Sequence, residues 1–249
     1  MEKNPTENPL LRVLTGHLSV RRYTDEPVEP EDLRAVEEAG RRSPTDASGH
    51  LYAFVRVTDP ALRQRLFEIC GRQEHVLRAP EFLVACADFR RVRLLLGKQG
   101  KEFSMGPRAM LLFGTLDAAI AGRSMAVAAQ ALGYGICFVG AVQNRPAEVA
   151  EALKLPEGVL PLFGLCVGRP AEPLPAQKPR LPPEALFMEN RYREADDGLL
   201  AACLSAMESK KKPMAWPEQL NLYFGKGGIF EKREEEMRRA AARAGFSRE

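Results

Sequence analysis

Three residues near the amino terminus have types and spacing that suit an anion. His17, Ser19 and Arg21 occupy alternate positions, so an extended backbone would place their side chains on one face. An imidazole, a hydroxyl and a guanidinium together suit a phosphate, which the guanidinium can bind in bidentate fashion. Taken alone, the segment is explained more simply as a solvated basic turn.

A second pair of cations alternates much further along the chain. Lys178 and Arg180 flank Pro179 within a proline-rich stretch, and the proline ring restricts the backbone that presents them. Two cations on one face suit a phosphate or an electron-rich ring edge. A solvated linker accounts for this segment by itself, so it is the two clusters together that indicate an anionic ligand.

Two further segments offer contacts for a flat polar heterocycle. The loop over residues 43–50 is dense in short donors and acceptors, among them Thr45 and Asp46. Residues 138–141, which include Val139 and Gly140, could bring bare backbone up against a ring. The end of a buried strand is the simpler interpretation of that second segment.

Other chemistries find little support in the sequence. His17, His50 and His75 share no metal-ligand spacing with one another or with the cysteines. The chain has no GxSxG nucleophile motif, no GxGxxG and no GxxxxGK[ST]. No pair of carboxylates stands out for acid–base work, so we predict neither a metal nor a catalytic protein side chain.

Periodicity and capping residues predict the elements that must position these groups. We expect helices over residues 10–15, 30–42, 59–70, 109–132, 146–155, 199–207 and 231–245. We expect strands over residues 51–57, 82–87, 136–139 and 160–167. The segment 94–108 is predicted to be an irregular surface excursion, and the helix over 109–132 to be buried on most sides.

Composition places the chain among folded, intracellular proteins. It has 249 residues, 45% of them hydrophobic, and a net charge of +3, which argues against a disordered chain or a nucleic-acid coat. The five cysteines show no CxxC spacing and are expected to be buried free thiols. Neither a signal peptide nor a membrane-length apolar run is evident, so we expect a soluble cytoplasmic protein without nucleic-acid or membrane partners.

The order of several motifs resembles the nitroreductase family, and within it the bacterial oxygen-insensitive NADPH nitroreductases and flavin reductases. The resemblance covers residues of about 10–195 and rests on these segments: GHLSVRRYTDEPV, GRQEHV, GYGICFVGAVQN, LPLFGLCVGRP, KPRLP and ENRY. It implies an α+β fold with a central, mainly antiparallel sheet flanked by helices, and a homodimer that holds FMN. It implies a single domain over 1–249, with a proline-rich arm at about 170–195 and a helical C-terminal extension.

The same resemblance assigns roles to individual residues. His17, Ser19, Arg21 and Arg180 would contact the flavin phosphate, and Lys178 would lie near the pyrimidine edge of the flavin. The remaining implied cofactor contacts are Gln73, Thr45, Asp46, Val139 and Gly140. Two positions depart from the family pattern: Ala141 stands where a second glycine is usual, and Asp46 brings a carboxylate toward the ring.

The activity implied by the resemblance is that of an FMN-dependent oxidoreductase. It would transfer two electrons from NADPH or NADH to nitroaromatics, quinones or related small acceptors by a ping-pong scheme. One alternative is an NADPH-dependent reductase of free flavin. Another is a flavin-binding protein without turnover.

Overall fold

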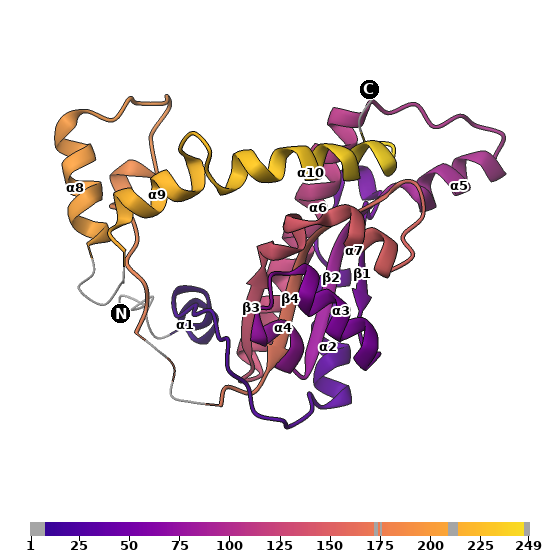
Figure 1. Cartoon of the computed structure of the whole chain (residues 1–249), viewed down its shortest axis with the longest axis horizontal. Helices are drawn as coiled ribbons and strands as arrows, with labels where there is room; N and C mark the ends of the chain where they lie inside the picture. Colours follow the sequence, from indigo (N-terminus) through magenta and orange to yellow (C-terminus); the bar gives the residue numbers. More distant parts are fainter. Residues whose placement is uncertain (1–7, 172–173, 175, 209–213, 247–249) are drawn as a thin grey trace. The chain divides into compact units, whose positions relative to one another are not determined.

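The computed structural model describes residues 8–171, 174, 176–208 and 214–246 (Figure 1). Contacts divide the chain into two compact units, which we describe separately: residues 1–175 with 235–249, and residues 176–234. The prediction of a single domain therefore stays a prediction.

A four-stranded sheet forms the centre of the first unit. Its strands are β1 (Tyr52–Arg56), β2 (Glu81–Asp88), β3 (Gly135–Val139) and β4 (Val159–Gly168). They lie in the order β1-β2-β4-β3, and all three neighbouring pairs are antiparallel. This confirms the predicted antiparallel α+β class and places β1 and β3 at opposite edges of the sheet.

Helices cover both faces of this sheet, because alternate side chains of the strands point to opposite sides. One face packs Val84 and Cys86 of β2 against α3 (Pro60–Ile69), α4 (Glu74–Arg78) and α7 (Pro146–Ala152). The other face packs Leu83 and Leu165 against α2 (Pro30–Arg41) and α6 (Pro107–Ala131). A further helix, α1 (Pro9–Thr15), precedes them and contacts α6.

Helix starts agree with the local signals. Pro60 occupies the first turn of α3, and the Asp59 carboxylate accepts a hydrogen bond from the Leu62 amide at 2.8 Å. The acidic residues Glu31 and Asp32 lie in the first turn of α2, where their negative charges interact favourably with the positive end of the helix dipole. Both starts were predicted at these residues.

The long helix α6 differs from its prediction. One face is buried, but Leu111, Leu112, Leu116 and Ile120 are exposed large hydrophobic residues in the described chain. Of the described helices, this is the one long and apolar enough to cross a membrane by length and composition. Core helices of globular proteins share that composition, and the buried face of α6 packs on α2 and all four strands.

The prediction of irregular structure for 94–108 was partly wrong. Residues 94–98 belong to α5 (Arg90–Lys98), and α6 already begins at Pro107. Leu94 and Leu95 of α5 are both exposed, and no residue of this helix is fully buried.

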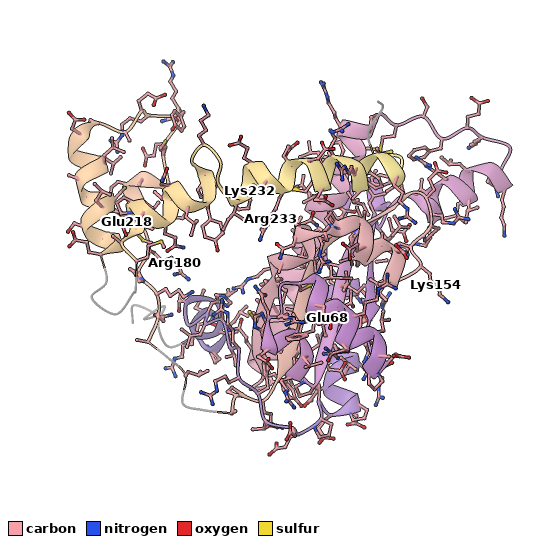
Figure 2. All side chains as sticks on the ribbon, viewed as in Figure 1. Glu68, Lys154, Arg180, Glu218, Lys232 and Arg233 are labelled. Carbon is pink, nitrogen blue, oxygen red and sulfur yellow. The ribbon has the colours of Figure 1, made fainter. Side chains whose placement is uncertain are left out.

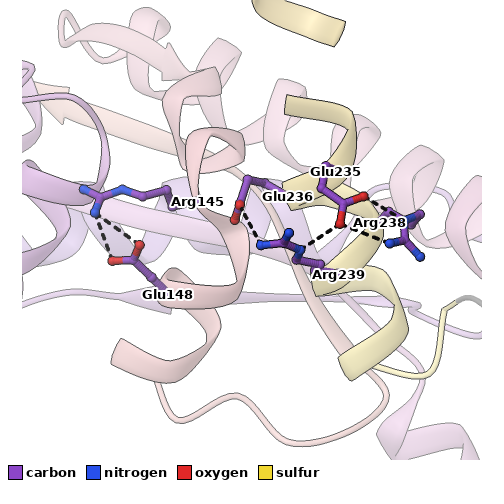
Figure 3. Close-up of polar contacts among 6 residues, drawn as sticks. All are labelled: Arg145, Glu148, Glu235, Glu236, Arg238 and Arg239. Carbon is purple, nitrogen blue, oxygen red and sulfur yellow. Dashed lines mark hydrogen bonds and ion pairs between the residues drawn. The ribbon is translucent and has the colours of Figure 1, made fainter. Parts of the chain in front are cut away.

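The last helix, α10 (Ile229–Arg243), contributes its C-terminal part to the first unit. Ala240, Ala241 and Phe246 are buried against Phe89 and Met110. Exposed ion pairs line the other side: Glu235 lies 3.0 Å from Arg238 and 2.8 Å from Arg239 (Figure 3). Such exposed pairs contribute little to stability, so alanine and phenylalanine burial fixes this end of the chain.

The second unit is helical and contains α8 (Asp197–Met207), α9 (Trp216–Phe224) and the short η4 (Pro183–Ala185). The described part of the predicted proline-rich arm is irregular apart from η4. Cys203 is the one buried hydrophobic side chain among the described residues of this unit. All five cysteines of the chain are buried and free, as predicted.

Candidate functional site

The segment that carries His17, Ser19 and Arg21 runs along the outer edge of β3. Ser19 forms a parallel bridge with Ile136, and the Val20 amide donates to the Ile136 carbonyl at 2.9 Å. The Val20 side chain is buried against Gly135, where an added Cβ would approach its Cγ2 to 2.6 Å. Because Val20 points inward, its neighbours Ser19 and Arg21 lie on the outward side of this extended backbone.

Tyr23 fixes the C-terminal end of this segment. Its hydroxyl donates to the Val20 carbonyl at 2.7 Å, and burial raises the pKa of this phenol above its ordinary range, so it stays protonated. The Thr24 amide donates to the Arg169 carbonyl at 2.9 Å, which ties the segment to the chain that leaves β4. The exposed Arg21 is thus presented from a fixed backbone.

Helix α4 brings a second predicted residue toward the same edge. Gln73 is exposed at the N-cap of α4, and His75 is buried in its first turn. Burial, and next the positive charge of Arg21, lower the pKa of His75. Val20 and Tyr23, which lie on either side of Arg21 in the chain, share one core cluster with Val76 of α4, so Arg21 and the Gln73–His75 turn lie in one region.

A buried arginine holds α4 in place. The Arg63 guanidinium donates to the carbonyls of Val76 and Ala79, each at 3.0 Å, and to that of Val57 at 2.8 Å. It also lies over the Phe82 ring, 5.4 Å from the centroid. These bonds join the end of α4 to the core, which fixes the turn that presents Gln73.

The end of β3 gives access to bare backbone. Val139 is buried, whereas Gly140 is exposed and starts the short helix η3 (Gly140–Asn144). Within the described residues, a Cβ at Gly140 would meet no atom within 4 Å. Ala141, which stands where the family usually has a glycine, is buried in the core.

The loop with Thr45 and Asp46 lies elsewhere on the sheet. It precedes β1, whereas Ser19 and Gly140 lie at β3, on the opposite edge. Three strand spacings of about 4.8 Å separate those edges. The strand order therefore separates these two groups of predicted residues on the sheet.

Lys178 and Arg180 belong to the second unit and are both exposed. Figure 2 labels Arg180, whose guanidinium donates to the carbonyls of Lys178 and Pro179 at 3.0 and 3.1 Å. These bonds lie within its own segment. The prediction that Arg180 shares an anion with Arg21 stays a prediction.

Two features of the site were not predicted from the sequence. His75 was given no role, although it lies in the segment GRQEHV. Asp117, an acidic residue in the long apolar helix α6, is 2% exposed, and its carboxylate accepts hydrogen bonds from the backbone amides of Asp46 and Leu51. Among the described residues, no three His, Cys, Asp or Glu side chains converge as metal ligands.

Comparison with known proteins identifies relatives over most of the chain. A family model described as "Nitroreductase family" matches residues 14–169. An oxygen-insensitive NADPH nitroreductase of Salmonella typhimurium is 41% identical over 78% of this chain and 79% of its own length. An FMN reductase [NAD(P)H] of Bacillus subtilis is 36% identical over 87% of this chain and 91% of its own.

Solved structures share the fold. NADPH:FMN oxidoreductase from Vibrio harveyi, complexed with NAD⁺, superposes with a TM-score of 0.85 at 28% identity, covering 95% of this chain and 98% of that one. Nitroreductase A from Vibrio parahaemolyticus has a TM-score of 0.80 at 29% identity, covering 86% and 89%.

Proposed function

The chain belongs to the nitroreductase family, and we propose that it is an FMN-dependent oxidoreductase that uses NAD(P)H to reduce small acceptors. FMN supplies the redox chemistry by accepting two electrons from the nicotinamide and passing them to an acceptor such as a nitroaromatic or a quinone. The chain's own residues have to bind, orient and screen that group. Relatives named for nitroreductase and flavin reductase activity support this activity.

The observation that carries the proposal is the arrangement along the edge of β3. Ser19 and Arg21 project outward from a backbone fixed to β3, and Gly140 leaves open space at the end of the same strand. A hydroxyl and a guanidinium suit the phosphate of FMN, and uncovered backbone suits the flat ring. The residues present therefore fit the cofactor.

Within this proposal each predicted residue has one task. Arg21 and Ser19 bind the phosphate, with His17 beside them. Gln73, held by α4, and the backbone at Val139 and Gly140 orient the ring. Lys178 stabilises negative charge on the reduced ring, and Arg180 adds a second cation for the phosphate.

We further propose that two copies of the chain complete each site. Thr45 and Asp46 lie at the β1 edge, away from Arg21 and Gly140 at the β3 edge, so a second copy would have to supply them. The exposed leucines of α6 offer an apolar surface that a homodimer would cover. We place the enzyme in the cytoplasm, with small molecules rather than nucleic acid or membrane as partners.

A reductase of free flavin is the second candidate, because two relatives are named FMN reductase. Steady-state oxidation of NADPH and NADH by the FMN-loaded protein separates the two activities. A nitroaromatic acceptor should support turnover without added free flavin. Turnover that appears only when free FMN is supplied would favour the second candidate, and no turnover with either would favour a binding protein.

A further inference from the structure

A single buried carboxylate closes the loop that carries Thr45 and Asp46. Asp117 lies on the buried face of α6 and is 2% exposed. Its Oδ1 accepts a hydrogen bond from the Asp46 amide at 2.9 Å, and its Oδ2 accepts one from the Leu51 amide at 3.0 Å. Both carboxylate oxygens are therefore bound to backbone, one at each end of the loop over residues 46–51.

The conformation of this loop requires stabilisation by residues outside it. Ala47, Ser48 and His50 all have positive φ, at 46°, 53° and 46°. Residues other than glycine rarely adopt this conformation, and each one costs free energy. Within the loop, the Gly49 amide donates to the Asp46 carbonyl at 2.7 Å, and the longest bond, from the His50 amide to Thr45 Oγ1, measures 3.4 Å.

The exit of the loop is held from the other side as well. Arg91 donates to the carbonyls of His50, at 2.8 Å, and Tyr52, and pairs with the buried Asp88 at 3.0 Å. Arg91 thus binds carbonyl groups while Asp117 binds amide groups. Among the residues that the structure describes, Asp117 alone binds both ends of the loop. Hydrogen bonds to a carboxylate are stronger than those between neutral groups.

We propose that Asp117 is a positioning residue, which sets the conformation of the loop over residues 46–51 so that Thr45 and Asp46 meet the flavin. This inference rests on the proposed function, because it takes these two residues as flavin contacts. Asp117 itself need not touch the cofactor. Its effect passes through the two backbone amides.

The test compares Asp117→Asn with Met110→Ala. Asparagine keeps the size of the side chain but replaces one acceptor oxygen with an NH₂ group, which faces a backbone donor. Met110 lies on the same helix and is buried in the core cluster that also contains Leu51, so the control is read at the Asp46 amide. Truncation of Met110 lowers stability by leaving a cavity, so it controls for general destabilisation.

Two measurements are made below the melting temperature of every variant. Hydrogen exchange of the flavin-free proteins measures the exchange rates of the Asp46 and Leu51 backbone amides. Fluorescence quenching reports the affinities for FMN and for riboflavin. In Asp117→Asn, we expect exchange in the loop to rise and both affinities to fall by the same factor, about 10-fold, because the loop contacts the ring and not the phosphate.

The control variant should melt at a lower temperature but keep both affinities and the exchange of the Asp46 amide. Wild-type exchange and affinity in Asp117→Asn would overturn the proposal. Equal losses of affinity in the two variants at equal loss of melting temperature would also overturn it, because general destabilisation would then suffice. A wild-type protein that binds no FMN would instead overturn the proposed function. The exchange data would still test whether Asp117 sets the conformation of the loop over residues 46–51.

Discussion

Burial, and next the positive charge of the Arg21 guanidinium, lower the pKa of the His75 imidazole, although Arg21 and His75 come from different segments of the chain. The extended segment beside β3 supplies Arg21, and helix α4 supplies His75. The two segments meet at one edge of the sheet, where the positive charge of Arg21 lies beside a neutral imidazole. A phosphate is the ligand that the charge of Arg21 favours, and the site around Arg21 leads to four predictions.

The first prediction concerns the phosphate contact. Arg21→Ala should weaken FMN binding by ~1.5–3 kcal/mol, or roughly 10- to 150-fold, because a charge-assisted hydrogen bond to the phosphate is lost. Riboflavin, which lacks the phosphate, should lose much less. Titration of both ligands by fluorescence quenching measures the difference, with Arg22→Ala as the neighbouring control. Equal losses for the two ligands would place the damage in the fold rather than in a phosphate contact.

A second prediction uses the open space at Gly140. Gly140→Val should leave the melting temperature nearly unchanged, because an added Cβ meets no described atom within 4 Å and the φ of Gly140 is not positive. The larger side chain should nevertheless keep a flat ring from the backbone and lower FMN affinity by at least about tenfold. Gly97→Ala, at another open position, is the matched control. Wild-type FMN affinity in Gly140→Val would show that the ring binds elsewhere.

The third prediction concerns pH. Burial and the charge of Arg21 lower the pKa of His75 below its ordinary value of 6.5, so the unfolded chain binds this proton more readily than the folded one. Stability from the neutral imidazole is present above pH 6.5 and is lost as pH falls from there toward the folded pKa. The free energy of unfolding of the flavin-free protein should fall less between pH 7 and 5 in His75→Gln than in wild type. Urea denaturation at each pH measures this, and parallel curves would refute it.

The fourth prediction concerns assembly. Leu112 on α6 is 56% exposed and has exposed apolar neighbours along the helix. Leu112→Glu should shift the particle from twice the chain mass to the mass of one chain, because a dimer would bury a charge there. Light scattering measures the mass, and Leu95→Glu on α5 should remain dimeric. A wild-type protein with the mass of one chain and bound flavin would contradict the shared site.

Local signals in the sequence predicted much of the frame. Pro30 and Asp59 mark helix starts at the residues where the structure has them. The apolar run over 82–87 is a strand buried on both faces. The alternation of His17, Ser19 and Arg21 predicted that an extended backbone would place these side chains on one face, and the segment does run extended beside β3 with Val20 buried. Each of these signals depends on near neighbours in the chain.

The remaining features depend on residues far apart in the chain. The Asp117 carboxylate accepts hydrogen bonds from backbone amides 71 and 66 positions away. The spacing of side chains in the sequence does not indicate a bond to backbone at that separation. The charge of Arg21 contributes to the lowered pKa of His75 only because the fold brings the two segments together. That the loop before β1 and the segment beside β3 lie at opposite edges depends on strand order. A sequence motif does not report that order.

We propose above all that this chain binds FMN and reduces it with NAD(P)H. Anaerobic titration of the FMN-loaded protein with NADPH, and separately with NADH, tests it through the visible absorption of the flavin. We predict that about one equivalent of the preferred nicotinamide per site bleaches the flavin band, and that a nitroaromatic then restores it. A protein that binds no FMN, or whose bound flavin keeps its colour with both nicotinamides, would contradict the account.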